Sequence, residues 1–389
     1  MKKINSYLLI LSSIALLASC SQKKSSSTSS SVESSVSSES LVISESFESS
    51  ESEPEVSETE ESETKSAISE TEEESETHET ELSIEESSEK LSSTEGSSLP
   101  KENLEVTVAS PKGAPAVGLY NHVFEDNVEV NDPTNVQAWL LAGNKDVVIA
   151  PTNAGCNLIS KKNVSYKLAA ILTFGNFYLV STGNDENDTL DADDPIFIFQ
   201  TATDIPAKLF SYVYSEMNFT NIYYGGDNSN AARNLILGYD ELDEDNAPLD
   251  YVLVAEPALS NALSKNKNAK VVGNIQELYK TKSGGKMITQ ASVFVHKDLE
   301  KEKADKFLST LEFEVNYLLD NPLIIDEIFT SYEDLQVAAK LGANKELLKT
   351  VLKENSLGLG FKNAKENKES VDSFLETIGF SATSEEIYY

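Results

Sequence analysis

From Leu104 onward, the chain alternates short apolar runs with longer amphipathic stretches. Apolar runs bounded by Gly, Pro, Asn or Asp are typical of strands, and uninterrupted ones suit a sheet covered on both faces. They predict strands at residues 104–109, 128–130, 147–150, 166–172, 177–181, 196–199, 221–224, 250–255, 270–272 and 288–296. Helical periodicity and caps predict helices at 117–125, from 133, at 154–160, 204–217, 228–237, from 257, and at 299–319, 322–332, 335–340, 344–354 and 370–378. This alternation predicts an α/β fold with doubly wound sheets.

The strand–helix series occurs twice. The first series ends with FYLVS at 177–181, the acidic stretch 183–195 follows, and the second series starts with IFIF at 196–199. A long helical part then completes the chain. Two α/β lobes, with the chain returning to the first, are the simplest architecture for this order. Ligands of such sheets bind beyond the carboxyl ends of the strands.

The N-terminus has the pattern of an export signal. Lys2 and Lys3 precede an apolar run from Tyr7 to Leu17, which is too short to span a bilayer, and small residues lead to Cys20. The L-A-S-C ending resembles a bacterial lipoprotein signal. That resemblance implies removal of residues 1–19 and a lipid on the Cys20 sulfur; the alternative is an ordinary signal with an incidental Cys.

Residues 20–103 are rich in Ser, Glu and Thr. From Cys20 to Pro100 there are 22 glutamates and no aspartates against four lysines, a net charge of −18. Such a segment buries too little apolar surface to offset its chain entropy, which predicts a disordered linker. We interpret it as a spacer, and the alternative is an interaction tail for cations or a basic partner.

Charge and cysteine content limit the function of the remainder. It carries 43 acidic against 25 basic residues, and Arg233 is the only arginine of the chain. Without a basic stripe, a nucleic-acid partner is not expected. Cys156 is the only cysteine besides Cys20, so no disulfide is expected within the folded part. No G-x-G-x-x-G or Walker A pattern occurs, and the His and Cys residues are scattered, so we expect no cofactor and no metal site.

Several segments carry a family likeness in a fixed order: a lipoprotein-like signal, a strand running into SPKGAPA, then DVVIAPTN, TFGNFYLVS and QASVFVHKDL, with a helical tail. Over residues 104–380 the chain resembles the substrate-binding lipoprotein of an ABC importer, most similarly the nitrate, sulfonate, taurine and thiamine-precursor branch with the type 2 periplasmic binding fold. The resemblance implies lobe I at 104–183 with 292–389, lobe II at 196–288, and crossings near 183–195 and 289–291.

The same resemblance implies a non-enzymatic receptor that traps one small organic or anionic solute between its lobes. Its partners would be the permease and ATPase subunits of the importer, and the membrane through the lipid on Cys20. We expect a monomer on the extracytoplasmic face of the cell membrane, and the long spacer suits the thick wall of a Gram-positive surface. The alternatives are a surface adhesin or structural lipoprotein with a vestigial cleft, and an enzyme dependent on Glu256 or Cys156.

In lobe I, the candidate ligand-binding residues follow predicted strands: Ser110, Gly113, Ala114, Pro115, Thr152, Asn153, Thr173, Phe174, Gly175 and Asn176. Backbone N–H groups at a helix start favour an anionic or electron-rich group. Each position also has a structural interpretation. The SPKGAPA segment can be a plain tight turn, Thr152 and Asn153 a helix cap, Phe174 a core residue and Gly175 a bulge.

In lobe II, the candidates again follow strands: Gln200, Thr201, Asp227, Asn228, Ser229, Arg233 and Glu256. Arg233 lies about one turn into its helix and could clamp a carboxylate or sulfonate with two hydrogen bonds. The alternative is a solvated helix charge.

Overall fold

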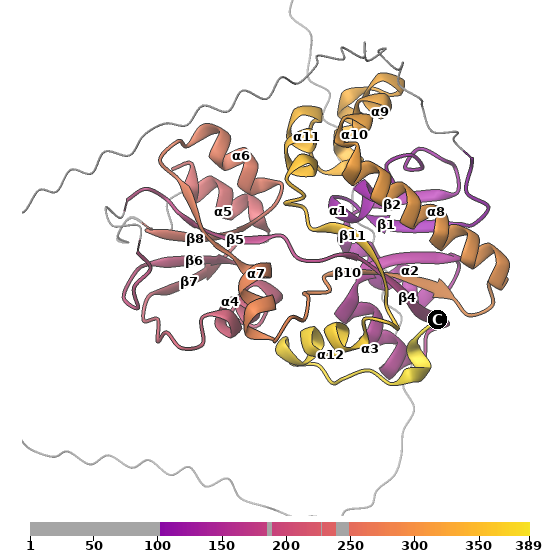
Figure 1. Cartoon of the computed structure of the whole chain (residues 1–389), viewed down its shortest axis with the longest axis horizontal. Coiled ribbons are helices and arrows are strands. Elements are labelled where there is room, and N and C mark those ends of the chain that lie inside the picture. The colour runs from indigo at the N-terminus through magenta and orange to yellow at the C-terminus, as the bar shows by residue number, and fades with distance from the viewer. Residues whose placement is uncertain (1–101, 185–188, 227, 239–248) are drawn as a thin grey trace, which may run out of the picture. The chain divides into compact units, whose positions relative to one another are not determined.

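The computed structural model describes residues 102–184, 189–226, 228–238 and 249–389. These residues form two sheets surrounded by helices (Figure 1). The first sheet has the order β11-β4-β10-β3-β1-β2 and the second has the order β7-β6-β8-β5-β9. The sheets define lobe I and lobe II of the fold.

The strands are β1 (Val108–Pro111), β2 (Val128–Asn131), β3 (Val147–Pro151), β4 (Tyr166–Thr173), β5 (Phe177–Ser181), β6 (Ile196–Phe199), β7 (Ile222–Gly225), β8 (Tyr251–Ala255), β9 (Lys270–Asn274), β10 (Ala291–His296) and β11 (Leu359–Asn363). The helices are α1 (Ala114–Val117), α2 (Val136–Ala142), α3 (Thr152–Lys162), α4 (Ile205–Val213), α5 (Ser229–Ile236), α6 (Ala258–Lys265), α7 (Ile275–Lys282), α8 (Lys301–Asp320), α9 (Ile325–Ser331), α10 (Asp334–Leu341), α11 (Lys345–Lys353) and α12 (Lys368–Thr377). Three 3-10 helices complete the description, η1 (Pro133–Asn135), η2 (Pro322–Ile324) and η3 (Glu385–Ile387). The predicted α/β fold with two doubly wound sheets is confirmed.

The two sheets share one topology. In each, three strands run parallel in the order second-first-third, as β2-β1-β3 and β7-β6-β8. The third strand pairs with an antiparallel strand that the chain enters directly after crossing from the other lobe, β10 beside β3 and β5 beside β8. A fourth strand parallel to the first three follows, β4 or β9. The carboxyl ends of the parallel strands in each sheet therefore lie at the edge where the chain crosses between lobes.

The first crossing differs from the predicted one. The strand β5 belongs to the second sheet, where it pairs with β8 and β9. The chain therefore crosses at residues 174–176, between β4 and β5, and not at 183–195. The acidic stretch has the composition of a linker but follows a strand that is already in lobe II. The second crossing leads from α7 into β10 over residues 283–290, and Ala291 is already the first residue of β10.

The apolar runs are buried because the sheets are covered on both faces. Along β3, Val147 and Ile149 pack into one cluster, and Val148 and Ala150 into the other, all with no exposed surface. The second of these clusters continues into lobe II through strand residues such as Leu253. This explains why β3 is apolar throughout rather than alternating.

Helix α12 contacts both lobes, although the predicted division assigned it to lobe I alone. Its Ser373 Oγ lies 2.8 Å from the hydroxyl of Tyr279 on α7, and the Lys208 ammonium of α4 donates to the Ile378 carbonyl at 2.6 Å. The C-terminal segment therefore joins lobe II to lobe I in addition to the two crossings.

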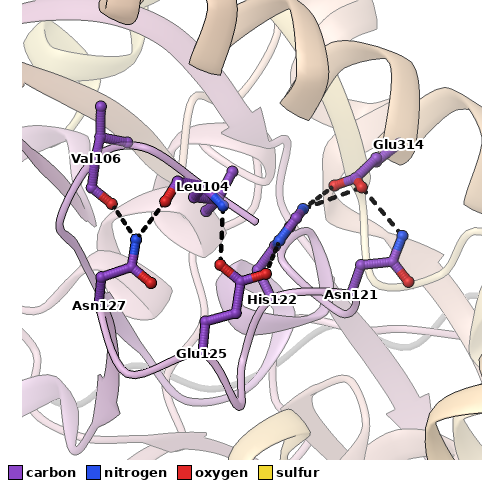
Figure 2. A network of polar contacts seen from close by, with 7 residues as sticks. All are labelled: Leu104, Val106, Asn121, His122, Glu125, Asn127 and Glu314. Atoms are coloured by element: carbon purple, nitrogen blue, oxygen red, sulfur yellow. Dashed lines mark hydrogen bonds and ion pairs between the residues drawn. The ribbon is translucent and has the colours of Figure 1, made fainter. Parts of the chain in front are cut away.

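A buried polar network joins the first residues of lobe I to α8 (Figure 2). His122 is 1% exposed, and its Nδ1 lies 2.6 Å from Glu125 while its Nε2 lies 3.0 Å from both oxygens of Glu314. Glu125 also accepts from the Leu104 N–H at 2.9 Å, and Asn121 donates to Glu314 at 3.0 Å. Burial lowers the pKa of His122, but the hydrogen bonds and charges of Glu314 and Glu125 outweigh it and raise the pKa.

Close packing of α3 against β10 depends on a missing side chain. A Cβ on Gly155 would lie 2.1 Å from Cζ of the fully buried Phe294. Gly→Ala in an open helix stabilises by up to about 1 kcal/mol, but overpacking costs about 1–3 kcal/mol. We expect Gly155→Ala to lower the free energy of unfolding, measured by urea denaturation. In Gly225→Ala, the new Cβ would make an ordinary 3.6 Å contact and serves as the control; equal effects of both variants would contradict this account.

Candidate functional site

The candidate residues that the structure describes lie at the two facing sheet edges or in the helices that begin there. In lobe I they follow β1, β3 and β4, and in lobe II they follow β6, β7 and β8. Only the lobe II candidate Asp227 lies outside the described residues. The placement follows from topology, and the contacts of each residue determine what it can offer a ligand.

The turn after β1 makes its hydrogen bonds to other residues of lobe I. Ser110 is fully buried and donates to the Pro111 carbonyl at 3.1 Å. Gly113 has a φ of 88°, and its N–H donates to the Lys340 carbonyl of α10 at 3.4 Å. Ala114 and Pro115 start the one-turn helix α1. These contacts describe a tight turn packed against α10, with its first amide already engaged.

The start of α3 combines a satisfied and an unsatisfied side chain. Thr152 is fully buried, with Oγ1 2.6 Å from Ser292 Oγ and its N–H donating to the Gln290 carbonyl at 3.1 Å. Asn153 is half-buried, and its buried Oδ1 has no partner in the described protein. Neither side chain forms the helix-cap hydrogen bond considered from the sequence, since α3 has no side-chain cap.

The first crossing is held by short contacts from lobe I. Thr173 Oγ1 accepts from the Ala291 N–H at 3.0 Å, and the Phe174 N–H donates to the Gly358 carbonyl at 2.7 Å. Phe174 packs against the core, so the core interpretation of this ring holds. Gly175 has a φ of 89°, which favours glycine. These contacts fix the backbone of the first crossing at residues 173–175.

Asn176 connects the crossing to the end of β8. It is 6% exposed, its Nδ2 donates to the Glu256 carbonyl at 3.1 Å, and its own carbonyl accepts from the Glu256 N–H at 3.1 Å. Its Oδ1 is buried and has no partner in the described protein. Because Nδ2 donates to a carbonyl, Oδ1 is the acceptor atom of this amide and remains free.

Glu256 is a buried acid, 6% exposed. Its carboxylate accepts from the Ser260 N–H at 3.0 Å, from Ser260 Oγ at 2.8 Å and from Ser356 Oγ at 3.0 Å. Burial raises the pKa of Glu256, while the hydrogen bonds from Ser260 and Ser356 partly counter that shift. Ser356 comes from lobe I and its carbonyl accepts from the Tyr178 hydroxyl at 3.1 Å, so this group links the lobes.

The other lobe II candidates mainly cap helices or join elements. The Thr201 hydroxyl donates to Asp204 at 2.7 Å, and Asn228 Oδ1 accepts from the Asn230 N–H at 2.8 Å. Ser229 Oγ donates to the Ala255 carbonyl at 3.1 Å and accepts from the Ala255 N–H at 2.8 Å. Gln200 is half-buried with a φ of 69°, and its N–H donates to the Gly225 carbonyl.

The Arg233 guanidinium donates hydrogen bonds to side chains of its own helix. The guanidinium donates to Asn234 Oδ1 at 2.7 and 3.2 Å and to Asn230 Oδ1 at 3.2 Å. A bidentate clamp for an oxyanion would need these donors to be released. The contacts fit the structural interpretation of a helix charge better than a preformed clamp.

Two residues of the second crossing were missed by sequence reasoning. Thr289 is fully buried with an unpartnered Oγ1, and Gln290 has a buried, unpartnered Oε1. Together with Asn153 and Asn176, they contribute four of the seven unpartnered buried side-chain atoms among the described residues. All four come from the two crossings or from the helix start that hydrogen-bonds to Gln290. The only signal in the sequence was a Thr-Gln pair within an apolar run.

A separate groove of about 910 Å³ lies between α3, the start of β4 and the C-terminal residues 379–387. It includes Lys161, Lys167 and Cys156 and none of the predicted ligand-binding residues. Cys156 is 4% exposed, and burial raises the pKa of its thiol to about 12, so it stays protonated and unreactive at neutral pH.

Among the described residues, no group of three or more His, Cys, Asp or Glu side chains could hold a metal ion. Likewise, no helix in the described ranges is both long and apolar enough to cross a bilayer.

No protein-family model and no curated protein matches the chain. Solved structures do. An ABC transporter protein from Parabacteroides distasonis has a TM-score of 0.58 at 19% identity, covering 74% of this chain and 99% of its own. The periplasmic aliphatic sulphonate binding protein from Escherichia coli has a TM-score of 0.50 at 12% identity, covering 71% and 88%. The zinc-bound ligand binding component of an ABC-type import system from Staphylococcus aureus has a TM-score of 0.50 at 9% identity, covering 74% and 96%.

The first of these neighbours is an ABC transporter protein, and the other two are ligand-binding proteins, one of them named as a component of an ABC-type import system, in line with the sequence resemblance. At such identities the likeness shows the fold, which is that of the periplasmic binding proteins, and the ligand of each neighbour belongs to that neighbour alone.

Proposed function

We propose that this protein is a non-enzymatic solute receptor that binds one small molecule between its two lobes and delivers it to an ABC importer. The observation that carries the proposal is the seam at the two crossings. There the chain passes between the carboxyl edges of the two sheets, and four buried oxygens lack a partner in the described protein. An unpaired buried polar group costs about 1–3 kcal/mol, and a bound solute that pairs with it recovers that cost. The fold of the structural neighbours supports the same role.

Closure of the lobes explains how such a receptor signals occupancy. A solute that contacts both lobes shifts the equilibrium only by its preference for the closed form. In this chain, Ser356 of lobe I contacts Glu256 and Tyr178 of lobe II beside the seam. These hydrogen bonds connect the two lobes in the absence of solute, and a bound solute adds further contacts between the lobes. Reaction chemistry is not needed for this role.

A thermal-shift screen of the purified protein against sulfonates, nitrate, pyrimidines and amino acids tests the proposal. At a concentration of about 100 times the Kd, a solute stabilises the native state by about 2.7 kcal/mol. At about 2 °C for each kcal/mol, the expected rise in Tm is about 5 °C. If no small solute raises the Tm, the receptor role is contradicted.

The proposal includes attachment to the extracytoplasmic face of the membrane through a lipid on Cys20, with residues 20–103 as the tether and a monomeric folded part. Cys20→Ala removes the acceptor sulfur, so we expect the variant to leave the membrane fraction. Detergent phase partition of the expressed full chain measures this. As a matched control, Cys156→Ala should partition like the wild type, because that thiol is buried in lobe I. Retention of the Cys20 variant in the detergent phase would contradict lipid anchoring.

A further inference from the structure

One polar atom at the seam is a fixed hydrogen-bond acceptor, and this limits the chemistry of a solute. Asn176 Oδ1 can only accept, because Nδ2 already donates to the Glu256 carbonyl. Thr289 Oγ1 is buried in the second crossing without a partner in the described protein, and its hydroxyl can accept a hydrogen bond as well as donate one. The carboxylate of Glu256 is buried at the end of β8, the strand whose backbone pairs with Asn176.

Three basic side chains near these edges are engaged elsewhere. Lys286 pairs with Glu369, and Arg233 donates to Asn230 and Asn234 of its own helix. Lys340 lies over the Phe124 ring, 5.3 Å from its centroid. Among the contacts of the described residues, none brings a Lys or Arg to Asn176, Thr289 or Glu256.

An oxyanion and an N–H donor would therefore bind at the seam with different affinities. A buried anion needs a counter-charge or several donors, and Asn176 Oδ1 offers it neither. An ammonium, amidine or amino group would instead donate to this free acceptor oxygen. Hydrogen bonds from charged donors are the stronger ones, so this difference is enough to determine ligand class.

We propose that the solute is a nitrogenous molecule that presents ammonium, amidine or amino N–H donors to Asn176 and Thr289, and not a sulfonate, nitrate or other oxyanion. The inference rests on the proposed receptor function. It differs from the anionic solute that the sequence resemblance allowed, because two of the anion-binding features expected then are occupied: the Gly113 amide by the Lys340 carbonyl and the Arg233 guanidinium by its helix.

Matched probes of opposite polarity test the inference on the purified protein. Guanidinium and nitrate share a planar shape, and putrescine and succinate share a four-carbon length; agmatine, cytosine and ethanesulfonate complete the panel. We expect at least one N–H donor of the panel to bind saturably in calorimetry and each anion to bind at least tenfold more weakly, which corresponds to about 1.4 kcal/mol.

Thr289→Val tests the location. The isosteric change removes a hydroxyl without a protein partner, so the Tm of the free protein should stay or rise, while affinity for the bound probe should fall about tenfold. Thr182→Val is the matched control: Thr182 is also buried, its hydroxyl donates to the Leu249 carbonyl at 2.6 Å, and its loss should lower the Tm without changing affinity.

The outcomes separate the two proposals. Tighter binding of nitrate, succinate or ethanesulfonate overturns the donor inference and leaves the receptor function in place. Unchanged affinity in Thr289→Val overturns the assigned location. No saturable binding by any probe counts against the receptor function itself and against the inference with it.

Discussion

His122→Leu is expected to lower the free energy of unfolding by about 3–5 kcal/mol, because it leaves two carboxylates buried without their shared partner. Glu125 and Glu314 lie 7% and 10% exposed on either side of this imidazole. Removing one member of a buried charged group is costly, since the remaining charges are desolvated and repel each other. Urea denaturation of the purified variant measures the loss.

His296→Leu is the matched control. The His296 ring is more exposed, and its Nδ1 lies 3.9 Å from Asp298 Oδ2, a long distance for an ion pair. Removing the ring should therefore cost less than about 1 kcal/mol of stability. Similar losses in the two variants would show that the network in Figure 2 carries no special stability.

The same network predicts how stability depends on pH. Glu314 and Glu125 raise the folded-state pKa of His122 above its ordinary value near 6.5. The protonated form is therefore favoured in the native state. Its contribution is fully present below pH about 6.5 and is lost as the pH rises through the raised folded pKa. The loss over this window should be absent in His122→Gln, and its persistence there would assign the pH dependence to other groups.

Asn176→Leu is expected to weaken binding of the solute about 10- to 100-fold, since a hydrogen bond to a charged donor contributes about 1.5–3 kcal/mol. The substitution also removes the donor to the Glu256 carbonyl, which should cost about 1–3 kcal/mol of stability. Calorimetry measures the affinity, and urea denaturation measures the stability.

Comparison with Thr289→Val separates the two effects. Both variants should lose affinity, but only Asn176→Leu should lose stability, because only Asn176 has a hydrogen bond within the protein. If affinity followed stability across both variants, the loss of binding would be a consequence of partial unfolding and the assigned role of Asn176 would be wrong.

Much of the fold could be predicted because strands of a sheet that is covered on both faces appear in the sequence as uninterrupted apolar runs. The runs at 177–181 and 196–199 coincide with β5 and β6. Helix α1 ends at Val117, earlier than predicted, and η1 and turns of the chain replace part of the expected helical pattern. The strand β11 and helix α7 were not predicted: β11 is a short edge strand with two exposed residues, and α7 directly follows β9, although its N-cap Asn274 and Glu277 three residues later were a helix-start signal.

The site was only partly predictable. Its position at the carboxyl edges follows from the α/β pattern, so Asn153, Asn176 and Glu256 could be selected. Thr289 and Gln290 were expected near a crossing but were not selected as binding residues, because their unpartnered oxygens become visible only when β10 is inserted between β3 and β4. The crossing at 174–176 was also misplaced, since three residues between two apolar strands give no compositional signal.

Hydrogen–deuterium exchange of the purified protein, with and without the probe panel at saturating concentration, tests the central claim most directly. If a solute is held between the lobes, amides at residues 174–176 and 287–290 should gain protection together with the start of α6. Protection confined to the groove around Lys161 and the C-terminal residues, or no protection with any probe, would contradict a receptor that binds its solute at the seam.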